Sequence, residues 1–116
     1  MSKIIRFSPL GDPQRSAPAP DRIVHGQPEQ LLWNVYSDAK GWFHVGRWSS
    51  TPGSWRVQYT ENELCHLLSG RICLRDAQGT AYDFGAGDTF LICSGFAGVW
   101  EVLEPCVKLY AIYDPQ

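Results

Sequence analysis

The sequence predicts an all-β domain, a meander or sandwich of many short strands, and three observations support this. Short runs rich in aromatic and β-branched residues recur at close intervals from Leu31 onward. Glycine, proline or acidic turn residues bound each run. No window of the sequence places apolar residues at helical spacing over three turns. We therefore expect strands throughout the ordered part of the chain.

The chain is expected to form one domain with an N-terminal arm. Its 116 residues allow a single core of ordinary size, and 44% hydrophobic residues supply enough apolar surface to exclude global disorder. Residues 1–30 contain five of the eight prolines, including the run APAP, so we expect this segment to be an extended and mostly irregular arm. Residues 31–116 then form the single globular domain.

Nine runs are expected to be strands, and two turns between them can be recognised from their residues. The segments Asp76–Thr80 and Gly85–Asp88 have the composition of tight turns, so we expect antiparallel neighbours on either side of each. The nine runs, in chain order, are LLWNVY, GWFHVGRW, SWRVQY, ELCHLL, RICLR, AYDF, DTFLIC, GVWEVL and VKLYAIY.

Two of these runs are apolar on both faces. In Glu63–Leu68 and in Thr89–Cys93, both sets of alternating residues are largely hydrophobic, whereas a half-solvated strand would alternate with polar residues. Such strands need cover on both sides. One cover is the interior of the domain, and the other is either a second protomer or the N-terminal arm. We therefore expect a homodimer.

Charge and targeting signals narrow the classes of partner. Ten Lys and Arg against twelve Asp and Glu give a net charge of −2 without any basic run, so we expect no nucleic-acid partner. The apolar run near the N-terminus is too short for a signal peptide or a membrane span, so we expect no membrane association and a cytoplasmic protein. The four cysteines lack zinc or redox spacing and are expected to be buried free thiols: Cys65, Cys73, Cys93 and Cys106.

The segment GDTFLICSGFAGVWE, which begins at Gly87, resembles the second sequence motif of the cupin superfamily. That motif contains Gly-Asp, a strand, a further glycine and a metal-binding histidine. The segment Gly53–Gly70 resembles the first motif, because Glu63 precedes Gly70 with six residues between them. In this register the histidine places are occupied by Val57, Tyr59 and Gly98.

The resemblance covers residues 31–113 and implies a double-stranded β-helix, which is a jelly-roll barrel of the cupin type. Within the superfamily, the chain is most similar to small single domains of unknown function related to ethanolamine-utilisation cupins and ureidoglycine aminohydrolases. Since Glu63 is the only remaining motif ligand, we expect no bound transition metal and no other cofactor.

Three residues at alternate positions suggest acid–base chemistry. In a continuous strand, Tyr59, Glu61 and Glu63 would share one face. Two converging carboxylates would raise the pKa of one of them, which would suit a general acid or base, or would form an oxygen-ligand site for a hard cation. The alternative is that Glu61 lies in an exposed turn.

The tryptophans suggest a small-molecule pocket. Aromatic walls around a few polar groups are common in such pockets, although each ring could equally be a core or dimer contact. We single out Trp48, Trp100 and Tyr59 as ligand-binding candidates, and Trp100 first because it follows Gly98, where no histidine fills the space. Lys108 lies in an apolar strand and would need an anionic partner, either a ligand or Glu63.

The three histidines are expected to have no catalytic role. His66 alternates with Glu63 and Cys65 and should face away from the cavity, whereas His25 and His44 lack a second imidazole at a useful spacing. Two functional hypotheses remain. The first is a metal-free barrel that binds a small organic molecule. The alternative is a metal-independent isomerase or hydrolase that uses Glu63 and Tyr59 as acid and base.

Overall fold

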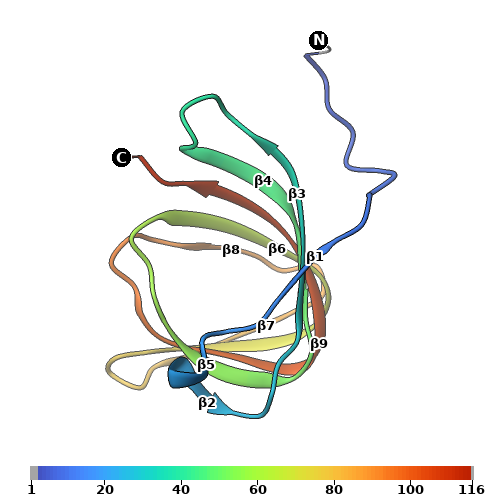
Figure 1. The fold of residues 1–116 in the computed structure, drawn as a ribbon. Coiled ribbons are helices and arrows are strands. Elements are labelled where there is room, and N and C mark those ends of the chain that lie inside the picture. Colours follow the sequence, from blue (N-terminus) through green and yellow to red (C-terminus); the bar gives the residue numbers. More distant parts are fainter. Residues whose placement is uncertain (1–2, 116) are drawn as a thin grey trace.

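The computed structural model describes residues 3–115, which form nine strands and one short 3-10 turn (Figure 1). The strands fold into a two-layered sandwich, which confirms the all-β jelly-roll prediction. The elements are β1 (Gln14–Ser16), η1 (Pro20–Arg22), β2 (Ile23–His25), β3 (Gln30–Ser37), β4 (Phe43–Ser50), β5 (Gly53–Gln58), β6 (Asn62–Asp76), β7 (Ala81–Gly85), β8 (Thr89–Ile92) and β9 (Ala97–Tyr113).

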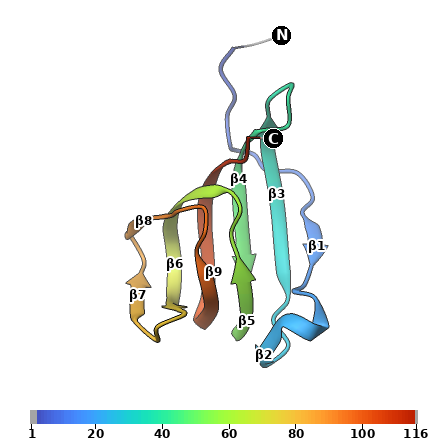
Figure 2. The ribbon, with the colours of Figure 1, turned by 90° about the vertical axis from the view of Figure 1, so that its left-hand side faces the viewer.

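Two long strands belong to both layers. The first half of β6 and the second half of β9 lie in one layer, in the order β8, β6, β9, β4, β3. The remaining halves lie in the other layer, in the order β7, β6, β9, β5, β2. Figure 2 shows β6 and β9 side by side at the centre of this arrangement. The layers are therefore continuous through bends in these two strands.

A glycine allows β6 to bend close to β9. The register of this pair shifts around Gly70, whose φ is +90°, a conformation that other residues rarely adopt. A β-carbon at Gly70 would lie 2.3 Å from the carbonyl oxygen of Pro105. The backbone of β9 thus occupies the space that a side chain would need.

Each of the nine expected strands overlaps an observed strand, but three of them are predicted one or two residues too long at one or both ends, and their number and one turn differ from the prediction. Residues 63–68 and 71–75 belong to the single strand β6, and residues 98–103 and 107–113 belong to β9. The turn Asp76–Thr80 joins the antiparallel neighbours β6 and β7 as predicted. The turn Gly85–Asp88 does not form a hairpin. It carries the chain between layers, so β7 and β8 each pair with β6 instead of with each other.

The N-terminal arm contains more regular structure than the sequence suggested. Strand β1 pairs with β3, and β2 pairs with β5, so the arm extends both layers at one edge. Its described residues nearest the N-terminus, from residue 3 onward, extend away from the sandwich (Figures 1 and 2). The indole N–H of Trp33 donates to the carbonyl of Gly11, which fixes the arm against β3. The arm therefore does not cover the outer faces of β6 and β8.

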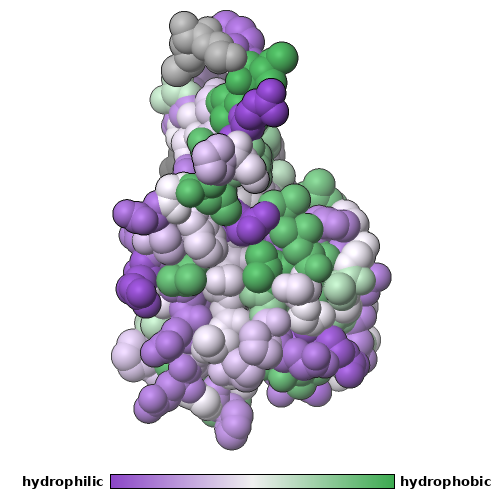
Figure 3. Space-filling model, turned by 90° about the vertical axis from the view of Figure 1, so that its right-hand side faces the viewer, coloured by the Kyte–Doolittle hydropathy of each residue, from purple (hydrophilic) through white to green (hydrophobic). Residues whose placement is uncertain are grey.

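Those outer faces carry an apolar row. Leu91, Leu64, Ala111 and Val45 lie directly opposite one another across β8, β6, β9 and β4. Leu64 is 48% exposed and Leu91 is 58% exposed. Seen from the side where the long strands bend, hydrophobic residues also gather below the protruding arm (Figure 3). We use the name apolar row for the four residues Leu91, Leu64, Ala111 and Val45.

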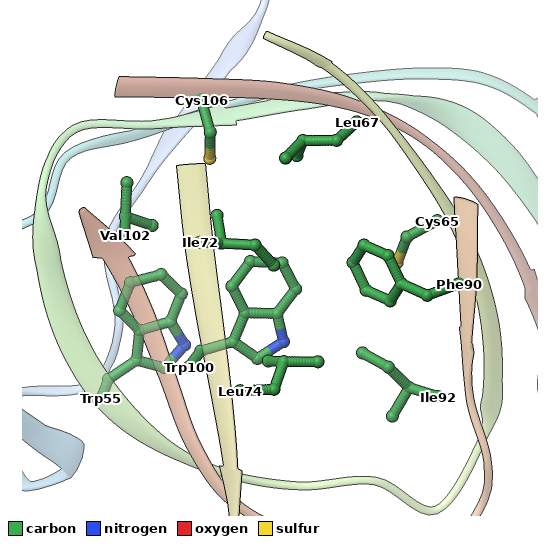
Figure 4. Close-up of a cluster of buried hydrophobic side chains, with 10 residues drawn as sticks. All are labelled: Trp55, Cys65, Leu67, Ile72, Leu74, Phe90, Ile92, Trp100, Val102 and Cys106. Carbon is green, nitrogen blue, oxygen red and sulfur yellow. The ribbon is translucent and has the colours of Figure 1, made fainter. Parts of the chain in front are cut away.

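The hydrophobic core lies between the layers (Figure 4). Ten buried residues from both layers form it: Trp55, Cys65, Leu67, Ile72, Leu74, Phe90, Ile92, Trp100, Val102 and Cys106. Three of the four free cysteines are buried as expected, but Cys93 is exposed because it follows the last residue of β8. Within residues 3–115, no helix has the length and apolar character needed to cross a membrane.

Candidate functional site

A cavity of about 450 Å³ lies between the layers, on the side of β3, β4 and β5. Its volume is within the usual range for small-molecule sites. Inward-facing residues of five strands and of the β5–β6 turn line it: Gln30, Leu32, Asn34, His44, Trp48, Trp55, Val57, Tyr59, Glu63, Trp100, Lys108, Tyr110 and Ile112. All five predicted site residues are among them: Trp48, Tyr59, Glu63, Trp100 and Lys108.

Tyr59 and Glu63 meet across the turn between β5 and β6. The backbone of Tyr59 is held by two hydrogen bonds, one to the carbonyl of Phe96 and one from the N–H of Gly95. Its hydroxyl donates to Oε1 of Glu63 at 2.8 Å, and the indole N–H of Trp100 donates to the Tyr59 oxygen at 3.2 Å. The two residues therefore come together as predicted, although Tyr59 lies in a turn and not in a continuous strand.

Lys108 neutralises the Glu63 carboxylate. Its Nζ atom lies 2.8 Å from Oε2 of Glu63, and both residues are only 5% exposed. The ammonium also lies 4.6 Å from the ring centroids of Trp48 and of Trp100, close enough for cation–π attraction. Buried charges are tolerated when they are paired and hydrogen-bonded in this way.

The environment moves the pKa values in the site away from neutrality. Burial alone would raise the pKa of Glu63, but the charge of Lys108 and hydrogen bonds from Lys108 and Tyr59 outweigh burial and hold it below its usual value. Burial is the largest influence on the pKa of Lys108 and lowers it, but the charge and hydrogen bond of Glu63, together with the interactions of Cys65 and Tyr59, outweigh burial, so the net shift is upward. Burial also raises the pKa of Tyr59. The pair is therefore ionised at neutral pH, and the carboxylate pKa is not raised as two converging carboxylates would require.

Three indole rings form one wall of the cavity. Trp48 and Trp100 meet edge to face at 5.5 Å between centroids. Trp55 and Trp100 lie nearly parallel, with 8° between their planes and 6.0 Å between centroids (Figure 4). Such aromatic surfaces bind flat apolar groups well. Trp55 in β5 and Trp100 in β9 are register partners in one layer, whereas Trp48 in β4 reaches them from the other layer.

Of the other residues considered from the sequence, Glu61 and His66 lie outside the cavity and His44 lines it. Glu61 lies in the turn, and its side chain accepts a hydrogen bond from the backbone of Thr60, so it does not join Glu63. As predicted, His66 faces the outer side of β6. Its ring nitrogen Nδ1 is hydrogen-bonded to the hydroxyl of Thr89. His44, in contrast, lines the cavity, with its ring held between Ser37 and the carbonyl of Gly41.

Sequence reasoning missed several lining residues of β3, β4, β5 and β9. Gln30, Asn34, Trp55 and Tyr110 were not selected, and Tyr110 donates its hydroxyl hydrogen to Asn34 at 2.8 Å. Gln30, Leu32 and Asn34 alternate along β3. That period of two was the available signal, but it could not show which face is turned inward.

The residues of this site do not fit a transition metal. Among residues 3–115, His, Cys, Asp and Glu form no group of three that could hold a metal ion. Both oxygens of Glu63 already bond to Tyr59 and Lys108. A β-carbon at Gly98, where the cupin motif places a histidine, would lie 1.9 Å from the carbonyl oxygen of Arg75. The backbone at this position therefore excludes an imidazole.

Comparison with known proteins gives a family match. Residues 37–110 match the family model described as the EutQ-like cupin domain. No curated protein matches the chain.

Solved structures share the fold. A protein of unknown function from the DUF861 family of Pseudomonas syringae superposes with a TM-score of 0.81 at 26% identity, and the alignment covers 93% of this chain and 46% of that protein. The chain thus spans about half the length of that relative. The EutQ protein of Clostridium difficile superposes with a TM-score of 0.68 at 11% identity, over 77% of this chain and 65% of that one. A predicted oxalate decarboxylase of Thermotoga maritima gives a TM-score of 0.72 at 19% identity, over 97% and 99%.

Proposed function

The chain belongs to the family of EutQ-like cupin domains, and from this premise we propose that it is a binding module that holds a small organic molecule in its cavity. One observation carries the proposal. The cavity of about 450 Å³ combines a wall of three indole rings with an ion pair whose charges are already satisfied. Such a site offers apolar contact area and fixed polar groups, which suits recognition of a small molecule.

The alternative, acid–base catalysis by Glu63 and Tyr59, has less support from the geometry. An efficient general acid or base has a pKa near the working pH. The pKa of Glu63 is held low and that of Tyr59 is raised, so neither group exchanges a proton readily at neutral pH. Their 2.8 Å hydrogen bond favours a structural role in which Tyr59 helps to hold the carboxylate.

A Glu63→Gln variant separates the two functions. A binding module should keep its affinity within about tenfold, because Gln can still accept the hydrogen bond from Tyr59. Catalysis by Glu63 instead requires turnover to fall by about a hundredfold or more. Equal turnover in variant and parent would exclude the acid–base alternative.

A screen with a blocked cavity tests the binding proposal. Small acids, amines, amides and sugars are tested by thermal shift and by the change in tryptophan emission, since three indoles line the site. We expect at least one compound to change both signals in the parent protein. Val57→Phe should weaken both responses, because Val57 lines the cavity and the larger ring would occupy part of it. Undiminished responses in this variant, or a screen without any response, would contradict the proposal.

We also propose that two copies pair through the apolar row. A two-fold interface joins a patch to itself, so a charged patch would repel its own copy, whereas an apolar and uncharged one suits it. Leu91, Leu64, Ala111 and Val45 carry no charge, and the arm does not cover β6 and β8. A second copy is the occupant that this self-complementary face favours.

A further inference from the structure

The charged groups of the cavity leave no charge for a ligand. Oε1 of Glu63 accepts from Tyr59 and Oε2 accepts from Lys108. The Lys108 ammonium contacts Glu63, the Cys65 sulfur at 3.7 Å, and two indole rings. A charged ligand would lose its hydration in this cavity without gaining a counter-ion. The site therefore favours an uncharged molecule.

The carboxamide of Gln30 faces the cavity without a protein partner. The residue Gln30 is 8% exposed and lines the cavity from β3. Among residues 3–115, no side chain or backbone group bonds to its amide. Its amide atoms are not among the fully enclosed unpaired ones, so they are accessible from the cavity. A carboxamide offers one acceptor and two donor hydrogens. It is therefore a recognition group that a ligand would satisfy.

Another part of the cavity lining is flat and carries an unpaired donor. Trp55 and Trp100 lie nearly parallel, and Figure 4 shows the two indoles beside each other. The indole N–H of Trp100 is engaged with Tyr59, but that of Trp55 has no partner within the part of the chain that the structure describes. An apolar planar group fits the wall, and an acceptor atom fits the Trp55 donor.

We infer that the cavity selects an uncharged molecule with a planar apolar body and a carboxamide-like head, and that Gln30 is the residue that recognises this head. The inference rests on the proposed binding function and names the class of ligand. The paired hydrogen bonds between two carboxamides would satisfy the Gln30 amide. A head without hydrogen-bonding groups would leave it unpaired, which is the source of the expected selectivity.

Four probes of one shape test this inference: benzamide, benzoate, benzylammonium and toluene. Each has the same ring, and at neutral pH their heads are a neutral amide, an anion, a cation and a methyl group. Dissociation constants are measured by tryptophan emission and confirmed by ligand-observed NMR. We expect benzamide to bind the parent protein at least about tenfold more tightly than either ion. Toluene measures the contribution of the aromatic wall alone.

Variants of Gln30 assign the selectivity to this residue. Gln30→Leu should weaken benzamide about tenfold and should not weaken toluene, because only the amide loses hydrogen bonds. Gln30→Glu adds a carboxylate at the same place and should move the preference to benzylammonium. Gln58→Leu is the matched control, since Gln58 is an exposed residue of β5 outside the cavity lining, and it should leave all four constants unchanged. Circular dichroism establishes that each variant is folded.

The outcomes separate this inference from the proposed function. If no probe binds, toluene included, the cavity is not a binding site of this size, and both proposals fail. If the probes bind but benzoate or benzylammonium binds as tightly as benzamide, the binding function stands and the selection of an uncharged ligand is wrong. If benzamide is preferred equally in the parent and in Gln30→Leu, the role of Gln30 is wrong.

Discussion

At the scale of single residues, the buried pair of Lys108 and Glu63 determines the character of the site. A cupin-type cavity needs a cation beside the motif glutamate if that glutamate is to stay ionised without water. Here Lys108 supplies the positive charge, 2.8 Å from the carboxylate and against two indole rings. The Lys108 side chain thus contacts Glu63 and Trp100 directly, and both of these residues are hydrogen-bonded to Tyr59.

Breaking this pair should destabilise the protein strongly. Lys108→Met leaves a carboxylate buried without a counter-ion, and we expect the free energy of unfolding in urea to fall by about 3–5 kcal/mol. The double variant Glu63→Gln/Lys108→Met should recover most of this loss, because no buried charge remains. Arg71→Met is the control, since its pairing with Glu104 is exposed and should matter little. A double variant as unstable as Lys108→Met would contradict this account.

The same pair should make stability depend on pH. The pKa of Glu63 is lower in the folded protein than its ordinary value of 4.5, so its contribution is complete above that value and is lost as the pH falls through the folded pKa. The pKa of Lys108 is raised above 10.5, so its contribution persists throughout the range below that value. Below pH 4.5, urea titrations should therefore show a steeper loss of stability for the parent than for the double variant. Parallel pH profiles would show that the pair does not act in this way.

The residues of this site differ in how far the sequence could predict them. Glu63, Tyr59 and Trp100 were found because the motif glutamate and the vacant histidine place at Gly98 mark the inner wall. The ion pair with Lys108 remained one of two alternatives, because it joins positions 45 residues apart and depends on the pairing of β6 with β9. For Gln30 the only local signal is the alternation along β3, which does not show the inward face, because that face is set by strands distant in sequence.

At the scale of elements, the bend of the long strands is the feature that positions the site. Glu63 precedes the bend of β6, and Lys108 follows the bend of β9, so both lie in the same layer. The sequence located every strand from β3 to β9, because aromatic and β-branched runs are clear local signals. The sequence could not show that two pairs of predicted runs are continuous in β6 and β9. Gly70 and Pro105, which separate these runs, are residue types typical of turns. In the structure, the pairing of β6 with β9 keeps the backbone extended on both sides of them.

Replacing the glycine at this bend should be costly. Gly70→Ala places a β-carbon 2.3 Å from the carbonyl oxygen of Pro105 at a φ of +90°. We expect thermal and urea unfolding to show a loss of about 1–3 kcal/mol. Gly85→Ala is the matched control, since a β-carbon there meets nothing within 4 Å, and its stability should remain close to that of the parent. Equal stabilities of the two variants would contradict the steric argument.

At the scale of the whole molecule, residues 3–115 leave the outer face that carries the apolar row uncovered. The arm extends the layers at the edges of β3 and β5, which excludes one of the two covers expected for the doubly apolar strands. The sequence could show that cover was needed but not which segment supplies it, because that depends on where the arm pairs. Large exposed apolar patches usually mark interfaces.

A charge in the apolar row should separate the two copies. We expect the parent protein to have the mass of a dimer in size-exclusion chromatography with light scattering at micromolar concentration. Leu64→Glu should have the mass of a monomer, because two carboxylates would be buried at the interface. Leu103→Glu places the same charge on a different exposed leucine of β9, outside the row, and should remain dimeric. A monomeric parent, or a dimeric Leu64→Glu, would contradict the proposed assembly.

The two strands that run through both layers have a consequence for how this protein loses its structure. Strands β6 and β9 contribute one half to each layer and pair along nearly their whole lengths. Each layer therefore depends on strands that continue into the other layer. One layer cannot melt and leave the other intact, so opening the cavity by local unfolding would dismantle the entire domain. In the proposed binding function, a ligand would therefore reach the cavity through its rim and not by separation of the two layers.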